Sequence, residues 1–539
     1  MPTSTAATRR RLPPAARART ALMALALLLW AVPTAYADVA GDVQARVARA
    51  ITATAPKKAT IGVQIVALGD APGDRKVLYT RSADRPMIPA SNLKLITTAA
   101  ALDTLGEDFK FRTQLLVRAN TSAGDVELAV VGDGDPSFGD ATLLKEMDGW
   151  GTRTVFETWA RVLSERGVRR VSALHLDDSV FDEEYAHPNW PADQRHKWYE
   201  AQVGGLNLNV NCLDVYLTRG SGRLMNYRLD PPTEYVTVDH SCRRGDRNAV
   251  WLTRAEGGNR IILAGQTNAS EQALSVTVHG PALYFGTVFA EVLREHGIDC
   301  ADPVVDRTIR AGWELQQQSA GQPDAGAEIT DTPDVSEAPE SQHMLAAQSM
   351  RHVPWQLLAV HQTGMGPVLA RTNKDSINMY AEALSKRLGF AATGEPGSWR
   401  SGEQAIKDFL FRIGAEAQEV NLDDGSGMSR QNRVTAAVLC DVLSRMHYGE
   451  AAEAFRDSLS EAGVDGTLEQ RFGNRGRDLR GRVFGKTGYI NGVITFSGYL
   501  HGRDGRWYAF SILVNDCPET WKAREMQEAI VEALDNALK

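Results

Sequence analysis

Three short motifs that combine a serine or lysine with other polar residues occur once each along this chain of 539 residues. They are Ser91-Asn92-Leu93-Lys94, Ser376-Ile377-Asn378 and Lys486-Thr487-Gly488, and they follow one another in that order. Any one of them could arise by chance in a chain this long, but the ordered set is specific. Ser91 and Ser376 are 285 residues apart, so a site built from all three motifs needs segments that are distant in the sequence.

The first motif places a serine and a lysine on one helix. Apolar residues at helical spacing predict a helix from Ser91 to about Leu105, ended by Gly106. Residues three apart share a helix face, and the start of a helix disfavours a cationic lysine. A neutral Lys94 could take the proton from Ser91, which needs a nearby base to attack a carbonyl carbon. A surface Ser–Lys pair is the alternative, and the other two motifs favour the catalytic interpretation.

The second motif opens a predicted helical stretch. In the catalytic interpretation, the Ser376 hydroxyl lies near Lys94 as a proton relay, and Asn378 hydrogen-bonds the backbone of a peptide substrate. The alternative is that Asp375 or Ser376 simply caps the helix.

The third motif follows the apolar pair Val483-Phe484 on a predicted strand. Lys486 and Thr487 could bind a substrate carboxylate, by charge and by a hydroxyl donor. Gly488 would let a substrate backbone lie close to the strand. The alternative is a lysine that flanks a hairpin turn.

Together these motifs resemble those of penicillin-binding proteins and serine β-lactamases. The 285-residue interval is far longer than in β-lactamases. It resembles the D-alanyl-D-alanine carboxypeptidase/endopeptidase family, the low-molecular-mass class C penicillin-binding proteins of the penicillin-binding protein 4 type, which carry large insertions there. Gly132-Asp133-Gly134-Asp135-Pro136 and the stretch DGSGMSR at Asp424 to Arg430 are similar to two further stretches of that family. The resemblance covers nearly all of the chain after residue 37 except an acidic segment.

The resemblance implies an α+β fold, with a β-lactamase/transpeptidase-like domain whose antiparallel sheet is flanked by helices and which is split by inserted β-rich domains. The expected divisions are a signal peptide at 1–37, the first transpeptidase part at 38–112, the inserted region at 113–312, an acidic flexible loop at 313–342 and the second transpeptidase part at 343–539. Apolar patterning predicts strands at Thr60–Leu68 and Val493–His501, and helices at Trp355–Leu369 and Trp521–Leu538.

The resemblance also implies a reaction. Ser91 would attack the carbonyl of a D-Ala–D-Xaa bond at the end or cross-link of a peptidoglycan stem peptide, and water would hydrolyse the acyl-enzyme. The backbone N–H groups of Ser91 and Tyr489 would form the oxyanion hole, β-lactams would acylate the same serine, and no metal or organic cofactor is implied. The expected catalytic residues are Ser91, Lys94, Ser376, Asn378 and Lys486; the expected substrate-binding residues are Thr487, Gly488, Tyr489 and Arg430.

Three positions bear on specificity. Tyr489 stands where relatives often have a small residue, so its side chain would narrow the site. Asn209 falls where some members have an aspartate that recognises the free amine of a diaminopimelate side chain, which puts that contact in question. Arg430 could contact the substrate peptide or could simply be solvated at the start of a helix.

Other functions fit the sequence less well. A β-lactamase or esterase on the same fold would differ by rapid deacylation. A non-catalytic peptidoglycan-binding scaffold would not need the intact serines and lysines of the motifs. No HExxH pattern supports a zinc peptidase. The stretch from Asp239 to Cys242 could supply metal ligands, but a disulfide beside a surface histidine is the favoured interpretation.

The first 37 residues have the features of an export signal. Five arginines precede an apolar run from Ala21 to Val32, and Ala35-Tyr36-Ala37 offers a cleavage site. The run is too short to span a bilayer, and no later segment is apolar enough to do so. We therefore expect cleavage after Ala37 and a periplasmic protein without a membrane span. The remaining chain would carry a net charge of −13, which argues against nucleic acid as a partner.

Two further features concern the expected insertion and its end. The segment from Glu314 to Gln342 contains seven acids, three prolines and no lysine or arginine, which predicts a flexible loop. All five cysteines follow residue 37. A Cys212–Cys242 disulfide and buried free thiols are equally favoured, because an exported protein can form disulfides.

Overall fold

Strand β1 (Thr60–Leu68) is apolar along most of its length because it is covered on both faces. The computed structural model describes residues 39–538 apart from 121–123, 146, 148, 269–272, 320–352, 416–419 and 473–478. In it, β1 belongs to a six-stranded antiparallel sheet of order β16-β17-β18-β19-β1-β2. The other strands are β2 (Lys76–Arg81), β16 (Ser460–Glu461), β17 (Val483–Ile490), β18 (Val493–His501) and β19 (Trp507–Asn515).

Helices cover both faces of this sheet. On one face, Val63 and Ile65 of β1 share a core with a helix over residues 39–54 and with α12 (Thr520–Ala537). On the other face, Val66 and Leu68 join a core made largely by helices. The helices of this second core are α2 (Leu93–Leu105), α7 (Met365–Asn373), α8 (Asn378–Thr393), α9 (Trp399–Arg412), α10 (Ala436–His447) and α11 (Ala452–Asp457).

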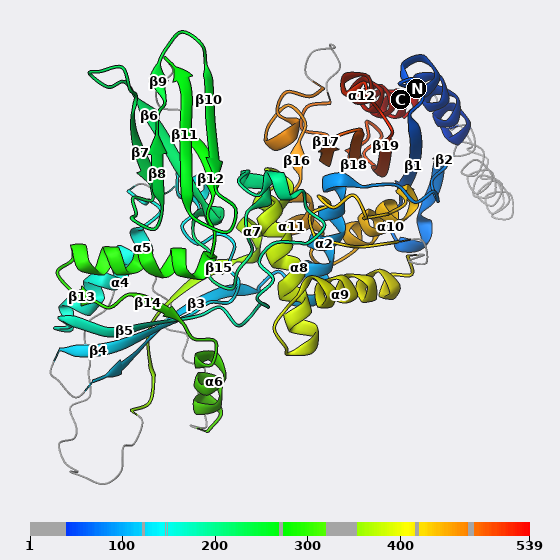
Figure 1. Ribbon diagram of the computed structural model, residues 1–539. Coiled ribbons are helices and arrows are strands. Elements are labelled where there is room, and N and C mark those ends of the chain that lie inside the picture. The colour runs from blue at the N-terminus through cyan, green and yellow to red at the C-terminus, as the bar shows by residue number, and fades with distance from the viewer. Residues whose placement is uncertain are drawn as a thin grey trace, which may run out of the picture.

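The sheet and its helices come from two separate parts of the chain, as the α+β prediction of a split transpeptidase-like domain requires. They lie together at the right of Figure 1, and the intervening residues form the part at the left.

The intervening part is built on a second six-stranded sheet of order β13-β5-β4-β3-β15, with β14 beside β5. Helices α4 (Thr154–Glu165) and α5 (Pro281–Glu295) pack against it through a shared apolar core. The region is therefore not only β-rich, since it contains two well-packed helices that were not predicted. The strands are β3 (Lys110–Ala119), β4 (Asp125–Val131), β5 (Arg170–Asp177), β13 (Asp299–Cys300), β14 (Pro303–Val305) and β15 (Gln356–Gly364).

The predicted helix at Trp355–Leu369 is wrong over most of its length. Residues Gln356–Gly364 form strand β15, which pairs antiparallel with β3, and only from Met365 is the chain helical. Pairing with a strand more than 200 residues earlier outweighs the local apolar pattern. It also places β15 in the intervening sheet, although residues from 343 onward were expected in the second transpeptidase part.

The intervening part also contains two small sheets, which lie at the upper left of Figure 1. They enclose a small apolar core that contains Val215, Cys242 and Leu263. The first sheet has the order β10-β11-β8, with β9 beside β11, and the second has the order β12-β6-β7. The strands are β6 (Cys212–Thr218), β7 (Asn226–Asp230), β8 (Thr237–His240), β9 (Arg243–Arg244), β10 (Ala249–Arg254), β11 (Arg260–Thr267) and β12 (Ala273–Thr277).

The five cysteines are all free and buried, so the alternative of a Cys212–Cys242 disulfide is wrong and that of buried thiols is confirmed. Burial raises the pKa of the Cys212 and Cys440 thiols, which keeps them uncharged.

The acidic segment is helical where it is described. Helix α6 (Ile309–Ser319) includes Glu314 and packs its Trp313 against a small core of the intervening sheet. The flexible loop predicted at 313–342 is therefore wrong for its first seven residues, because Trp313 anchors that turn. Residues 320–342 lie outside the described residues. No helix in the described part of the chain has both the length and the apolar character needed to cross a membrane.

Candidate active site

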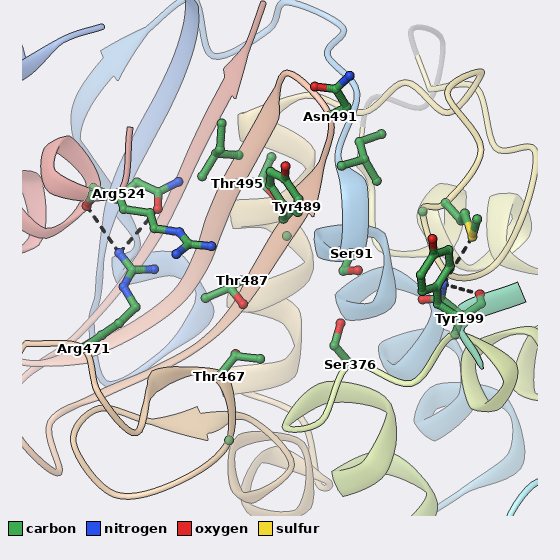
Figure 2. A pocket seen from close by; sticks show the side chains of 18 of the residues that line it. Ser91, Tyr199, Ser376, Thr467, Arg471, Thr487, Tyr489, Asn491, Thr495 and Arg524 are labelled. Atoms are coloured by element: carbon green, nitrogen blue, oxygen red, sulfur yellow. Dashed lines mark hydrogen bonds between the residues drawn. The ribbon is translucent and has the colours of Figure 1, made fainter. Parts of the chain in front are cut away.

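All three motifs meet at one cleft of about 1280 Å³ (Figure 2). Ser91, Ser376 and Asn378 lie on its helical side, and Thr487 and Gly488 belong to strand β17 on the other side. The lysines of the first and third motifs are fully buried beneath the cleft surface. The structure thus brings together residues that the sequence separates by almost 400 positions.

Ser91 lies in a short turn, η2 (Ala90–Asn92), immediately before α2. The preceding Ala90 has a φ of +46°, a conformation that costs energy for a residue with a side chain. Such strain is stored where the surrounding structure fixes the backbone. Here the surrounding structure fixes the backbone at Ala90, and with it the position of Ser91 at the start of the helix.

Lys94 lies one helical turn from Ser91, and its ammonium contacts the serine directly. Its Nζ donates to Ser91 Oγ at 3.1 Å, to Asn378 Oδ1 at 2.7 Å and to the Ser426 carbonyl at 2.9 Å. Burial lowers the pKa of Lys94 to about 8, although the carboxylates of Glu382 and Asp424 act in the opposite direction. A substantial fraction of Lys94 is therefore neutral near physiological pH and able to accept a proton.

Ser376 is bonded to the lysine of the third motif. Its Oγ accepts a hydrogen bond from Lys486 Nζ at 2.8 Å, whereas the three acceptors of Lys94 are Ser91, Asn378 and Ser426. Figure 2 shows the side chains of Ser91 and Ser376 facing each other within the cleft. Ser376 lines the same cleft as Ser91, and its predicted role as a proton relay near Lys94 stays a prediction. Ser376 also has a φ of +62°, which turns the chain just before α8.

Lys486 is buried and close to a second cation. Its Nζ donates to Ser376 Oγ and to the Thr487 carbonyl, both at 2.8 Å. Burial and, secondarily, the charge of Lys94 lower the pKa of Lys486, and Asp375 opposes this shift. The two lysines therefore disfavour each other's charged forms, and an anion entering the cleft would relieve that repulsion.

Asn378 is held within the protein at both ends of its side chain. Its Oδ1 accepts from Lys94, and its Nδ2 donates to the Tyr199 carbonyl at 2.8 Å. Asn378 therefore fixes Lys94; it also lines the cleft, and its predicted hydrogen bond to a substrate backbone stays a prediction.

The outer edge of β17 is open toward the cleft, because β16 pairs only with Phe484 and Gly485. At Gly488, a Cβ atom would lie 2.9 Å from the Ser91 backbone nitrogen and 2.2 Å from Thr495 Oγ1. Glycine is thus required by the close approach of Ser91, and its predicted role of letting a substrate backbone lie close to the strand stays a prediction. The side chain of Tyr489 is 56% exposed and lines the cleft.

The stretch 424–430 forms a loop behind Lys94, and two buried carboxylates hold it. Asp424 accepts from the backbone nitrogens of Gly427 at 2.8 Å and Ser429 at 2.6 Å. Glu382 of α8 accepts from the loop as well and was not singled out from the sequence. Its signal was its position four residues after Asn378, which places both on one helix face.

Two further expectations concerned specificity. Arg430 lines the cleft and donates to the Asn491 carbonyl at 2.9 Å, so it links the loop to the turn after β17. Asn209 is buried and bonded to the Cys212 carbonyl, and it is not among the residues that line the cleft. Asn209 lies in the 3-10 turn η5 (Asn209–Asn211), and its correspondence to an amine-binding residue of relatives stays a prediction.

Among the residues that the structure describes, no three His, Cys, Asp or Glu side chains are grouped to hold a metal ion. The chemistry available in the cleft is that of a hydroxyl, a poised amine and hydrogen-bond donors.

Comparison with known proteins assigns a family. The model of the D-Ala-D-Ala carboxypeptidase 3 (S13) family matches residues 43–321 and 341–537. A D-alanyl-D-alanine carboxypeptidase of Actinomadura sp. (strain R39) is 29% identical over 472 residues, which are 84% of this chain and 77% of that protein. The D-alanyl-D-alanine carboxypeptidase DacB of Haemophilus influenzae is 24% identical over 433 residues, 80% of each chain.

A solved structure confirms the fold. The crystal structure of penicillin binding protein 4 (dacB) from Haemophilus influenzae has a TM-score of 0.69 and 21% identity, over 91% of this chain and 99% of that chain. A complex of that protein with a β-lactam has a TM-score of 0.65. The family model spans both parts of the split domain and most of the insertion. The chain therefore belongs to the D-Ala-D-Ala carboxypeptidase 3 (S13) family and is a serine D,D-peptidase.

Proposed function

We propose that Ser91 is the nucleophile of this peptidase and Lys94 its general base. The observation that carries the assignment is the contact of Ser91 Oγ with a fully buried lysine whose pKa burial lowers to about 8. The neutral amine removes the hydroxyl proton as Ser91 attacks the scissile carbonyl. It then delivers that proton toward the departing D-amino acid, and water hydrolyses the acyl-enzyme.

The oxyanion is stabilised by the backbone N–H groups of Ser91 and Tyr489. The close approach of Gly488 to the Ser91 nitrogen supports this pairing, because it brings the open edge of β17 beside the nucleophile. A Cβ at residue 488 would push the two backbones apart.

The leaving D-amino acid carries a carboxylate, which we assign to Thr487 and to the pair formed by Lys486 and Ser376. The Lys486–Ser376 contact of 2.8 Å supports this assignment, because a carboxylate above Lys486 would favour the charged form of that lysine, which burial disfavours. Because Ser376 lies between Lys486 and the cleft, it can also pass a proton to the leaving amine.

We infer that the substrates are peptidoglycan stem peptides, cut at a terminal or cross-linking D-Ala–D-Xaa bond, and that β-lactams acylate Ser91. The β-lactam complex of the Haemophilus influenzae relative supports the second point. The site of action is the periplasm. The basic start, apolar run and Ala35-Tyr36-Ala37 of the sequence support export, although residues 1–38 lie outside the described residues.

The purified protein should release D-alanine from a stem peptide ending in D-Ala–D-Ala and should also be labelled by a fluorescent penicillin. An otherwise identical peptide ending in D-Ala–L-Ala is the matched control and should remain intact. Hydrolysis of a cross-linked muropeptide in the same assay would measure endopeptidase activity. If peptide hydrolysis returned to its full rate within seconds of penicillin addition, deacylation would be rapid; this result would contradict the peptidase assignment and favour a β-lactamase.

Acylation should depend on pH through Lys94. Only the neutral amine accepts the serine proton, so the second-order rate constant for penicillin acylation should rise about tenfold per pH unit below about 8 and level off above it. Stopped-flow labelling over this range measures the rising part of the plot of acylation rate against pH, which we call the acylation limb. Thermal unfolding at each pH is the control for folding. A rate that stays constant from about pH 6.5 to 9.5 would exclude Lys94 as the base.

A further inference from the structure

Helix α8 carries three polar side chains in one line. Asn378, Glu382 and Lys386 are four residues apart and share one helix face; Asn378 lines the cleft, and Glu382 and Lys386 are buried behind it. Each of them binds a different segment around the catalytic lysine. Asn378 binds Lys94 and the Tyr199 carbonyl, and Lys386 binds Asp182 at 2.6 Å.

Glu382 lies in the middle of this line and is fully buried. Its Oε2 accepts from the Gly425 backbone nitrogen and from Trp399 Nε1, and its Oε1 accepts from the Ser426 backbone nitrogen, each at 2.8 Å. All three partners are donors, which stabilises the ionised carboxylate. Burial and the nearby Asp424 act against them and raise the pKa of Glu382.

One residue connects Glu382 to the general base. Ser426 donates its N–H to Glu382, and its carbonyl accepts from Lys94 Nζ at 2.9 Å. The loop that Glu382 holds is therefore the loop that contacts the amine. Glu382 also acts on Lys94 through its charge, because a carboxylate near a buried ammonium favours the charged form of the ammonium. The other charged groups facing this pair are Asp424 of the loop, Lys386 of α8 and Lys486 of β17.

We propose that Glu382 is a positioning residue for Lys94. Its carboxylate holds Gly425 and Ser426 so that the Ser426 carbonyl meets the amine, and its negative charge sets the pH at which Lys94 gives up its proton. The inference rests on the proposed function, in which Lys94 is the base that activates Ser91.

The test compares the pH dependence of penicillin acylation in the full-length native protein and in two variants. Glu382→Gln removes the charge at nearly constant volume, so the acylation limb should move to lower pH by about one unit. Glu382→Asp keeps the charge but shortens the side chain. Its limb should stay within a few tenths of a pH unit of the native one, while its plateau rate falls because the loop is held less well.

A purely structural role for Glu382 would give a different result. Both variants would then lose stability or plateau rate, and the limb of Glu382→Gln would coincide with the native limb, which overturns the proposal. Should Glu382→Gln fail to fold, Trp399→Phe decides the question. It removes one of the two donors at Oε2 but keeps an aromatic ring and the carboxylate. The pKa of Glu382 then rises, and the limb should move in the same direction by a smaller amount; an unmoved limb overturns the proposal.

Failure of this inference differs from failure of the proposed function. If Ser91 and Lys94 do not have the assigned roles, the native protein shows no Ser91-dependent acylation limb at any pH. If only the role of Glu382 is wrong, the native limb is present and the Glu382→Gln limb coincides with it.

Discussion

Ser91→Ala should abolish labelling by fluorescent penicillin and should reduce peptide hydrolysis by at least about 1000-fold. The substitution removes the hydroxyl that we assign as the nucleophile and leaves the Lys94 amine with its other two acceptors, Asn378 and Ser426. Because Ser91 is a small residue in a turn at the cleft, the thermal unfolding temperature should remain within a few degrees of the native value. Gel fluorescence, product analysis and unfolding together measure the effect.

Ser376→Ala is the matched control for this result. Ser376 also lies in the cleft and faces Ser91, but its hydroxyl is bound to Lys486. Its variant should still be labelled, at a reduced rate, because the nucleophile and its base are intact. Labelling that persists in Ser91→Ala and disappears in Ser376→Ala would reverse the two assignments.

Gly427→Ala should reduce acylation by about 100-fold and destabilise the fold by about 2–4 kcal/mol. Gly427 has a φ of +86°, and a Cβ there would lie 1.8 Å from the Ala90 carbonyl oxygen. The added methyl group must displace either the loop that contacts Lys94 or the turn that carries Ser91. Both displacements separate the nucleophile from its base.

Gly394→Ala separates this clash from ordinary backbone strain. Gly394 ends α8 with a φ of +73°, and a Cβ there would have no atom within 4 Å. Its variant should lose only about 1 kcal/mol of stability and keep its acylation rate. Chemical denaturation gives the two stability changes, and stopped-flow labelling gives the two rates. Equal effects at the two positions would show that the clash with Ala90 is relieved without moving Ser91.

The parts of the fold that were predicted well have strong local signals. β1 and β18 begin and end where predicted, because each is a mostly apolar run bounded by polar or turn residues. Lys94 is bonded to Ser91, as the spacing of three residues on one helix indicated.

The parts that were missed depend on contacts between distant segments. β15 is a strand because β3 is its partner, and nothing within Gln356–Gly364 reveals that partner. Helix α4 was missed for a different reason, because Phe156, Trp159 and Leu163 have helical spacing that was overlooked among neighbouring strands. In the site, Ser376 bonds Lys486, which comes 110 residues later in the chain, and a linear motif carries no information about that distance.

The segment from His187 to Glu200 has a consequence for how the molecule can be divided. It belongs to the intervening part, yet its Trp190 donates to Asp424 at 3.0 Å and its Tyr199 carbonyl accepts from Asn378. The intervening part is therefore not a removable module attached to an independent enzyme. Excising it would remove the Trp190 donor of the buried Asp424 and the carbonyl that Asn378 binds beside Lys94, so both parts of the chain should melt in one cooperative transition.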